Sequence, residues 1–169
     1  MTDDEWVWKR NMKIGTWNVR SLFWPGALKV LHNELSKLDF DVTALQETRL
    51  ESDIQKFDNF VLFNSGLESK KHEFGCGFYV SGEFLKYVKD FKIINEKICC
   101  LRLKAKWFLC TLINVHAPTN GKTEEIKEEF YNLLQQNMNQ ISGLDIKIIL
   151  GRFYCKSWQR KHIHTYQWQ

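Results

Sequence analysis

A strand, a helix and a second strand follow one another early in the sequence, and this succession constrains the fold more than any other feature. Residues 13–19 alternate as a strand does, with Ile14 and Asn18 on the same face. Leucines then recur at helical spacing as far as Leu38, and residues 42–45 form a short apolar run. Because a crossover helix joins parallel strands, we expect a βαβ unit here.

The middle of the chain reads as strands without intervening helices. The segments that favour strand are residues 60–63, 75–80, 87–94, 98–103 and 108–115. Their connections are too short for crossover helices, so we expect antiparallel pairing. A helix over residues 123–141 and an apolar strand over 146–150 follow. The pattern alone predicts a mixed sheet with helices packed outside it.

Composition places the chain among soluble globular proteins. Its 169 residues suffice for one domain, and 44% of them are hydrophobic and 26% charged. The net charge of +4 is compatible with a polyanionic partner, and equally with a slightly basic surface. We expect an intracellular, soluble protein, because the acidic first residues lack an apolar signal core and no run approaches the ~20 apolar residues of a membrane span. Nucleus and cytoplasm both stay open.

Five cysteines lie mostly on apolar segments and form no C-x-x-C pair. They are Cys76, Cys99, Cys100, Cys110 and Cys155. An odd number of cysteines on strand-like segments favours buried, reduced thiols over a disulfide framework or a zinc site.

Three polar segments begin where predicted strands end, which is where α/β sheets usually bind ligands. They contain Asn18, Glu47 and His116. Glu47 offers the hard oxygen ligand that Mg²⁺ prefers, and Asn18 can donate and accept hydrogen bonds beside it. His116 is suited to contact a phosphate or to share a proton.

Each of these residues also has an ordinary structural interpretation. Glu47 is equally consistent with a solvated carboxylate, Asn18 with a turn cap, and His116 with a hydrogen-bonded structural histidine. Taken singly, the residues predict only a candidate cleft.

The order and the amino-acid sequences of the three segments together resemble those of a known family. Trp-Asn at 17–18, Gln-Glu-Thr at 46–48 and Val-His-Ala-Pro at 115–118 resemble motifs of the endonuclease/exonuclease/phosphatase family. The resemblance covers residues 12–151 and is closest to the endonuclease domains of non-LTR retrotransposons and their craniofacial development protein-like relatives. It implies the incomplete N-terminal portion of a DNase I-like α/β (α+β) four-layer sandwich, in which two mixed sheets pack face to face with helices outside.

The resemblance also implies roles for the three residues. Glu47 corresponds to the family's metal-binding glutamate, and Asn18 to the asparagine that helps order the metal and the phosphate. His116 takes the position of a residue that contacts the scissile phosphate. The implied cofactor is Mg²⁺, with Mn²⁺ as a substitute, and the implied partner is DNA, whose phosphodiester bond the family hydrolyses.

The chain departs from the family pattern after residue 151. The pattern has Gly-Asp-Phe-Asn, whereas this chain has Gly151, Arg152, Phe153 and Tyr154. The family's aspartate orients and activates a water molecule, but a guanidinium stays protonated and is no base. The later Asp-His elements of the family are also missing. We therefore expect weakened metal binding and a catalytically inactive chain.

Residues 152–169 have no amphipathic period and are expected to be an aberrant tail, with residues 1–11 as an extension at the other end. When residues 152–169 are back-translated into codons and read in the frame that starts at the second base, the codons are compatible with Asp-Phe-Ile-Ala-Lys-Val-Gly-Lys-Glu-Asn. This sequence resembles the one that follows the Gly of Gly-Asp-Phe-Asn in the family. We interpret the tail as a frameshifted sequence. An aromatic-basic nucleic-acid-binding tail is the alternative.

The sequence thus predicts the remnant of a Mg²⁺-dependent retrotransposon-type endonuclease. Two alternatives stay open. One is a non-catalytic module that binds metal or nucleic acid through Asn18, Glu47 and basic loops such as Lys70-Lys71. The other is a phosphoesterase that acts on small phosphates or phosphoinositides.

Overall fold

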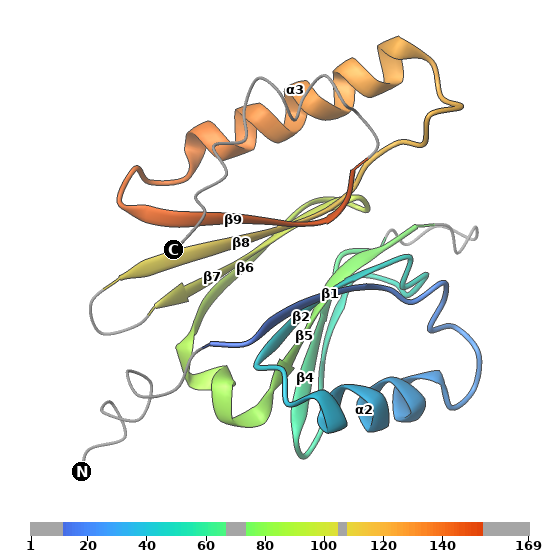
Figure 1. Ribbon diagram of the computed structural model, residues 1–169, viewed down its shortest axis with the longest axis vertical. Coiled ribbons are helices and arrows are strands. Elements are labelled where there is room, and N and C mark those ends of the chain that lie inside the picture. The colour runs from blue at the N-terminus through green and yellow to red at the C-terminus, as the bar shows by residue number, and fades with distance from the viewer. Residues whose placement is uncertain (1–11, 67–73, 105–107, 154–169) are drawn as a thin grey trace, which may run out of the picture.

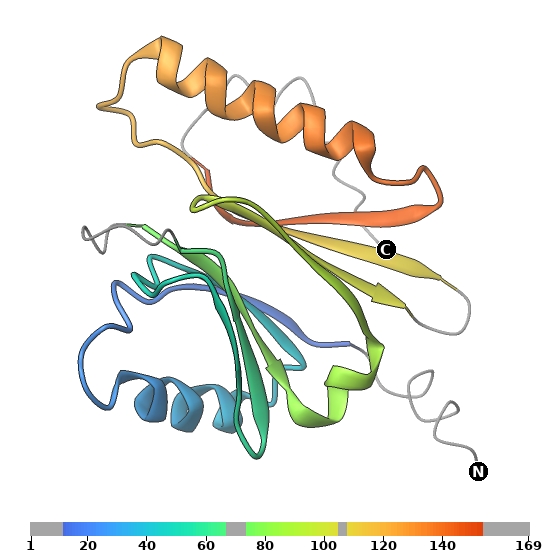
Figure 2. The same cartoon turned by 180° about the vertical axis from the view of Figure 1, so that it is seen from behind.

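Two sheets packed face to face, with one long helix outside each, form the architecture of this computed structural model (Figures 1 and 2). The structure describes residues 12–66, 74–104 and 108–153. Figure 1 shows four layers in the order α2, first sheet, second sheet, α3. The expected four-layer sandwich is therefore confirmed. The extension over residues 1–11 and residues 154–169 of the expected tail lie outside the described residues, whereas Arg152, the first residue of that tail, is the last residue of a strand.

The first sheet has five strands in the order β1-β2-β5-β4-β3. The strands are β1 (Ile14–Asn18), β2 (Val42–Gln46), β3 (Asp53–Lys56), β4 (Phe60–Asn64) and β5 (Cys76–Ser81). Helix α2 (Ala27–Leu38) connects β1 to β2, which pair in parallel as the βαβ prediction requires. The β2–β5, β3–β4 and β4–β5 pairs are antiparallel, as expected.

The second sheet has four strands in the order β6-β7-β8-β9. The strands are β6 (Val88–Asn95), β7 (Ile98–Lys104), β8 (Leu109–His116) and β9 (Asp145–Arg152). The first three pair antiparallel, and α3 (Glu124–Gln140) carries the chain from β8 to a parallel β9. Within the described ranges, no helix combines the length and apolarity that crossing a membrane requires.

The sheets differ in two details from those predicted from the sequence pattern. The pattern predicted one mixed sheet, whereas the structure has two, and the 3-10 helix η1 (Gly82–Tyr87) leads the chain out of the first sheet and into the second. The pattern also missed β3, a four-residue edge strand whose side chains are mostly exposed. A short strand with neither face buried has no apolar alternation to reveal it.

Three hydrophobic layers hold the sandwich together. Between the sheets, the core includes Phe78, Leu101 and Leu112. Leu35 packs α2 onto the first sheet, and Leu134 packs α3 onto the second. The cysteine prediction is confirmed for the four described cysteines, which are buried and free, whereas Cys155 lies outside the described residues.

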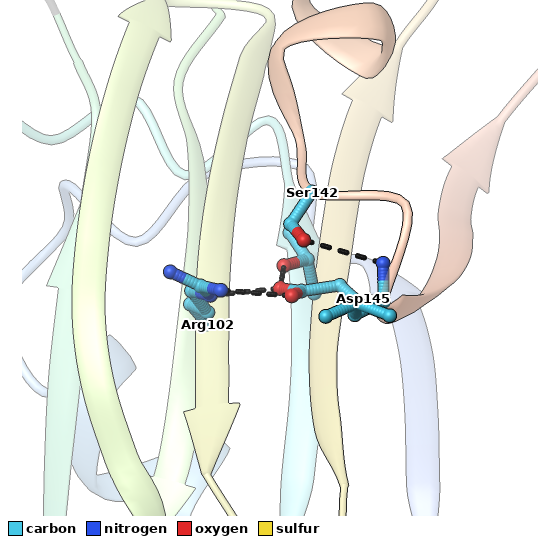
Figure 3. A network of polar contacts seen from close by, with 5 residues as sticks. Arg102, Ser142 and Asp145 are labelled. Carbon is cyan, nitrogen blue, oxygen red and sulfur yellow. Dashed lines mark hydrogen bonds and ion pairs between the residues drawn. The ribbon is translucent and has the colours of Figure 1, made fainter.

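A half-buried ion pair fixes the start of β9. Asp145 accepts hydrogen bonds from Nε and Nη2 of Arg102 at 2.7 and 2.8 Å, and from Oγ1 of Thr111 at 2.9 Å. Figure 3 shows Arg102 facing Asp145, with Ser142 in the turn that leads into the strand. This two-pronged contact ties β9 to β7 and β8, and so holds the register that ends in the pair His116–Arg152.

Candidate functional site

The carboxyl ends of β1, β2, β8 and β9 meet at one edge of the sandwich, and buried amides join the two sheets there. Nε2 of Gln46 donates to Oδ1 of Asn114 at 2.8 Å. Nδ2 of Asn114 donates to the carbonyls of Leu45 and Gly77 at 2.8 and 2.7 Å. Asn114 is fully buried, so these bonds fix β8 of the second sheet against β2 and β5 of the first.

Glu47 follows β2 directly and leaves the strand in a left-handed conformation, with φ of 57°. The next two residues are held by backbone bonds from Thr48 N to Gly75 O at 3.1 Å and from Arg49 N to Phe74 O at 2.8 Å. Gly75 has φ of +92°, and a Cβ on it would lie 2.4 Å from Oγ1 of Thr48. A glycine is therefore required for the close approach that supports the Glu47 turn.

Three nitrogen-bearing side chains surround one oxygen of Glu47. Nδ2 of Asn18 donates to Oε1 of Glu47 at 2.7 Å. Nε2 of His116 lies 3.7 Å and Nη1 of Arg152 lies 3.5 Å from the same oxygen. Oδ1 of Asn18 accepts from the Arg20 amide at 3.1 Å, which orients the Asn18 amide group towards Glu47. The structure thus brings together Asn18, Glu47 and His116, the three residues selected from the sequence.

His116 is buried at the end of β8. Its Nδ1 has no hydrogen-bond partner among the described residues. Burial lowers the pKa of His116 below its usual value. The Glu47 carboxylate opposes this shift, whereas the positive charges of Arg152 and Lys97 add to it. The imidazole is therefore neutral at neutral pH.

Arg152 is the fourth member of the cluster. It was expected as a departure from the family's Gly-Asp-Phe-Asn and was not among the candidate site residues. It pairs with His116 in the β8–β9 register, and its carbonyl accepts from Ala117 N at 2.9 Å. Gly151 has φ of +120°, and a Cβ on it would lie 2.0 Å from the Val115 carbonyl oxygen. This close approach of β9 to β8 brings the Arg152 side chain to Glu47. The available signal was the parallel pairing of the two strands, which puts both strand ends at one edge.

Carboxylates are sparse around this cluster. The described part of the chain contains no group of three or more His, Cys, Asp or Glu side chains that could hold a metal ion. Glu47 itself is partly buried, with a side chain 20% exposed. The arrangement is therefore a single carboxylate that accepts a hydrogen bond from Asn18 and lies close to His116 and to the Arg152 cation.

Comparison with known proteins agrees with this architecture. Residues 15–151 match the Endonuclease/Exonuclease/phosphatase family. Craniofacial development protein 2 of Tragulus javanicus is 27% identical over 150 residues, which cover 88% of this chain and 26% of that protein. The protein of the same name from Bos taurus is also 27% identical, with 25% of its length covered. The chain spans about a quarter of the length of these curated relatives.

Solved structures share the fold at low identity. The AP endonuclease LMAP of Leishmania major superposes with a TM-score of 0.63 and 18% identity, covering 89% of this chain and 57% of that one. The endonuclease domain of TRAS1, a telomere-specific non-LTR retrotransposon, gives 0.61 and 13%, covering 87% and 62%. D. rerio TDP2 complexed with a single-strand DNA product gives 0.59 and 14%, covering 83% and 59%. On its sequence match and its two-sheet architecture, the chain belongs to the endonuclease/exonuclease/phosphatase family.

Proposed function

We propose that this chain is a catalytically inactive member of its family, derived from a retrotransposon-type DNA endonuclease. The single observation that carries the proposal is the position of Arg152. Its Nη1 lies 3.5 Å from Oε1 of Glu47, beside Asn18 and His116. Phosphodiester hydrolysis needs a base that readies a water molecule, and a guanidinium stays protonated throughout the accessible pH range.

His116 is poorly placed to substitute as the base. Its Nε2 lies 3.7 Å from Oε1 of Glu47, and a carboxylate on that side favours the tautomer with the proton on Nε2. The lone pair then lies on Nδ1, which is buried and has no partner among the described residues. A general base must reach the proton it removes directly or through one water. A lone pair closed off from solvent supports a structural role for His116 in this chain.

The cluster does not fit the Mg²⁺ or Mn²⁺ that the family resemblance implies. Magnesium requires several oxygen ligands at about 2.0–2.1 Å in near-octahedral geometry. Here Oε1 of Glu47 already accepts from Nδ2 of Asn18 and faces a guanidinium. Oδ1 of Asn18, the amide's own oxygen, is engaged with the Arg20 amide. Among the four side chains of the cluster, Asn18, Glu47, His116 and Arg152, only Glu47 carries a carboxylate.

A plasmid-nicking assay tests the proposal. Supercoiled DNA is incubated with the full chain in Mg²⁺ or in Mn²⁺, beside a Glu47→Ala variant. We expect the two proteins to give the same background, because loss of the acid-base groups typically lowers rates by orders of magnitude. Nicking at ordinary enzyme rates by the wild type, abolished in Glu47→Ala, refutes the proposal.

A non-catalytic nucleic-acid-binding module is the second candidate, supported by the positive charges beside the cluster. Nζ of Lys97 lies 4.5 Å from the centre of the Phe74 ring, which in turn packs edge-on against His116. Arg152 lies on the other side of the same histidine in the sheet register. Lys70-Lys71, the basic pair expected to help, lies outside the described residues.

Binding of a labelled oligonucleotide across a salt series separates this candidate from an inert fold. Each phosphate contact adds about one unit to the slope of log affinity against log salt. Arg152→Gln is expected to reduce that slope by about one unit if Arg152 contacts a phosphate. An oligonucleotide that fails to bind even at low salt excludes the module.

A further inference from the structure

Arg152 is held beside Glu47 by the backbone of the second sheet as well as by its own charge. The residue ends β9, and the β8–β9 pairing includes the Val115–Gly151 and His116–Arg152 pairs. At its far end, β9 is anchored by the Arg102–Asp145 pair. The backbone that carries the guanidinium is therefore constrained at both ends of the strand, while the Arg152 side chain itself is 45% exposed.

The contacts at Glu47 compensate the negative charge of its carboxylate without an added ion. The guanidinium neutralises its charge at 3.5 Å, and the amide of Asn18 occupies Oε1 at 2.7 Å. A divalent cation on Glu47 would lie within a few ångströms of the positive charge of Arg152. Like charges at such a separation repel strongly in a partly buried setting. The Glu47 side chain is 20% exposed and the Arg152 side chain 45%, so solvent screens part of this repulsion.

We propose that Arg152 is a tethered cation that takes the place of a divalent metal at Glu47. The wild-type chain then binds neither Mg²⁺ nor Mn²⁺ at this site, and removing the Arg152 charge opens the site to metal. The inference rests on the proposed function in one respect, the assignment of Glu47 to the metal position of the family. It goes further, because it names the chain's own group that excludes the cofactor.

Mn²⁺ titration followed by electron paramagnetic resonance measures this directly, since the signal of free Mn²⁺ falls as the ion binds. The full-length wild type is compared with Arg152→Gln, which loses the charge, and with Arg152→Lys, which keeps it. Glu47→Gln and the double variant Arg152→Gln/Glu47→Gln define how much of any binding belongs to this carboxylate. Far-ultraviolet circular dichroism checks that each variant is folded.

We expect the wild type, Arg152→Lys and Glu47→Gln to share one weak background. Arg152→Gln should bind Mn²⁺ at least about tenfold more tightly, and the double variant should lose that gain. Equal affinity in the wild type and Arg152→Gln overturns the inference. If Arg152→Gln does not fold, the wild type still decides the question. Mn²⁺ binding by the wild type above the Glu47→Gln background overturns the inference. The absence of such binding, together with weak binding by Arg152→Lys, supports it.

The two proposals fail in different ways. Mn²⁺ binding through Glu47 in a wild type that does not nick DNA overturns the tethered cation and leaves the inactive-endonuclease proposal intact. Glu47-dependent nicking by a wild type that binds no Mn²⁺ in the titration does the reverse.

Discussion

At the scale of single residues, the cluster is organised by amides as much as by charges. Asn18 uses both ends of its amide, one towards Glu47 and one towards the Arg20 backbone. Asn114 does the same in full burial, between Gln46 and two carbonyls of the opposite sheet. An amide is suited to this role because it offers donors and an acceptor without the cost of burying a charge.

Replacing Asn114 by alanine should lower the free energy of unfolding by about 2–4 kcal/mol, since it removes three buried hydrogen bonds that join the two sheets and leaves Nε2 of Gln46 with its bond to Oγ1 of Thr16. Urea denaturation measures the change. Asn132→Ala, at an exposed position of α3, is the matched control and should stay within about 0.5 kcal/mol of the wild type. A loss for Asn114→Ala no larger than that of the control would show that these bonds do not join the sheets.

At the scale of elements, β9 links the stability of the second sheet to the geometry of the cluster. One end of the strand is fixed by Asp145, and the other end presents Arg152 to Glu47. Between them, Gly151 passes so close to Val115 that a side chain has no room. The strand therefore places a cation at the cluster only if both its anchor and its close approach are intact.

Gly151→Ala tests the close approach. The new Cβ would clash with the Val115 carbonyl at a positive φ, so we expect the free energy of unfolding to fall by at least about 2 kcal/mol. Gly121→Ala is the control, because a Cβ there meets nothing within 4 Å. Thermal unfolding of the two variants side by side distinguishes a local clash from a general intolerance of alanine. Equal melting temperatures would mean that β9 does not approach β8 so closely.

The anchor of β9 should make stability depend on pH. The Arg102 guanidinium lowers the pKa of Asp145 below its ordinary value of 3.8. A lowered pKa in the folded state stabilises the protein above the unfolded value, and this contribution is lost as the pH falls below 3.8. Asp145→Asn should therefore cost about 1–3 kcal/mol at pH 7 and progressively less in acid.

Urea denaturation of wild type and Asp145→Asn over a pH series checks this sign. Asp58→Asn, at an exposed position between β3 and β4, serves as the control and should differ little from wild type at either end of the series. A difference between wild type and Asp145→Asn that stays constant or grows towards acid pH contradicts the ion-pair account.

At the scale of the whole molecule, the four layers explain why the cluster lies at an edge. Residues at alternate positions of each strand face the layer between the sheets, as Ile14, Ala44, Leu112 and Ile148 do. Continued to the strand ends, the same alternation turns Asn18, His116 and Arg152 towards the rim of that layer. The apolar core stops there, and polar side chains begin.

Much of this organisation was readable from local pattern. The leucine spacing before Leu38 predicted α2, and the short run at residues 42–45 predicted a parallel partner for β1. Glu47 was identifiable because a hard oxygen ligand follows an apolar strand within a family-like motif. These features depend on neighbours in sequence, so periodicity and turn chemistry are enough to reveal them.

Only the tertiary structure decided what surrounds Glu47. Asn18, His116 and Arg152 are separated from it by 29, 69 and 105 positions, and no local pattern specifies which of them approaches which oxygen. The division into two sheets by η1 and the close approach at Gly151 set those distances. The sequence by itself determined the βαβ unit, the antiparallel strands and the candidate residues, and its family resemblance implied the layers. Long-range packing determined that an arginine, rather than open space for a metal, lies against the carboxylate, because contacts between sheets are not encoded in the period of either strand.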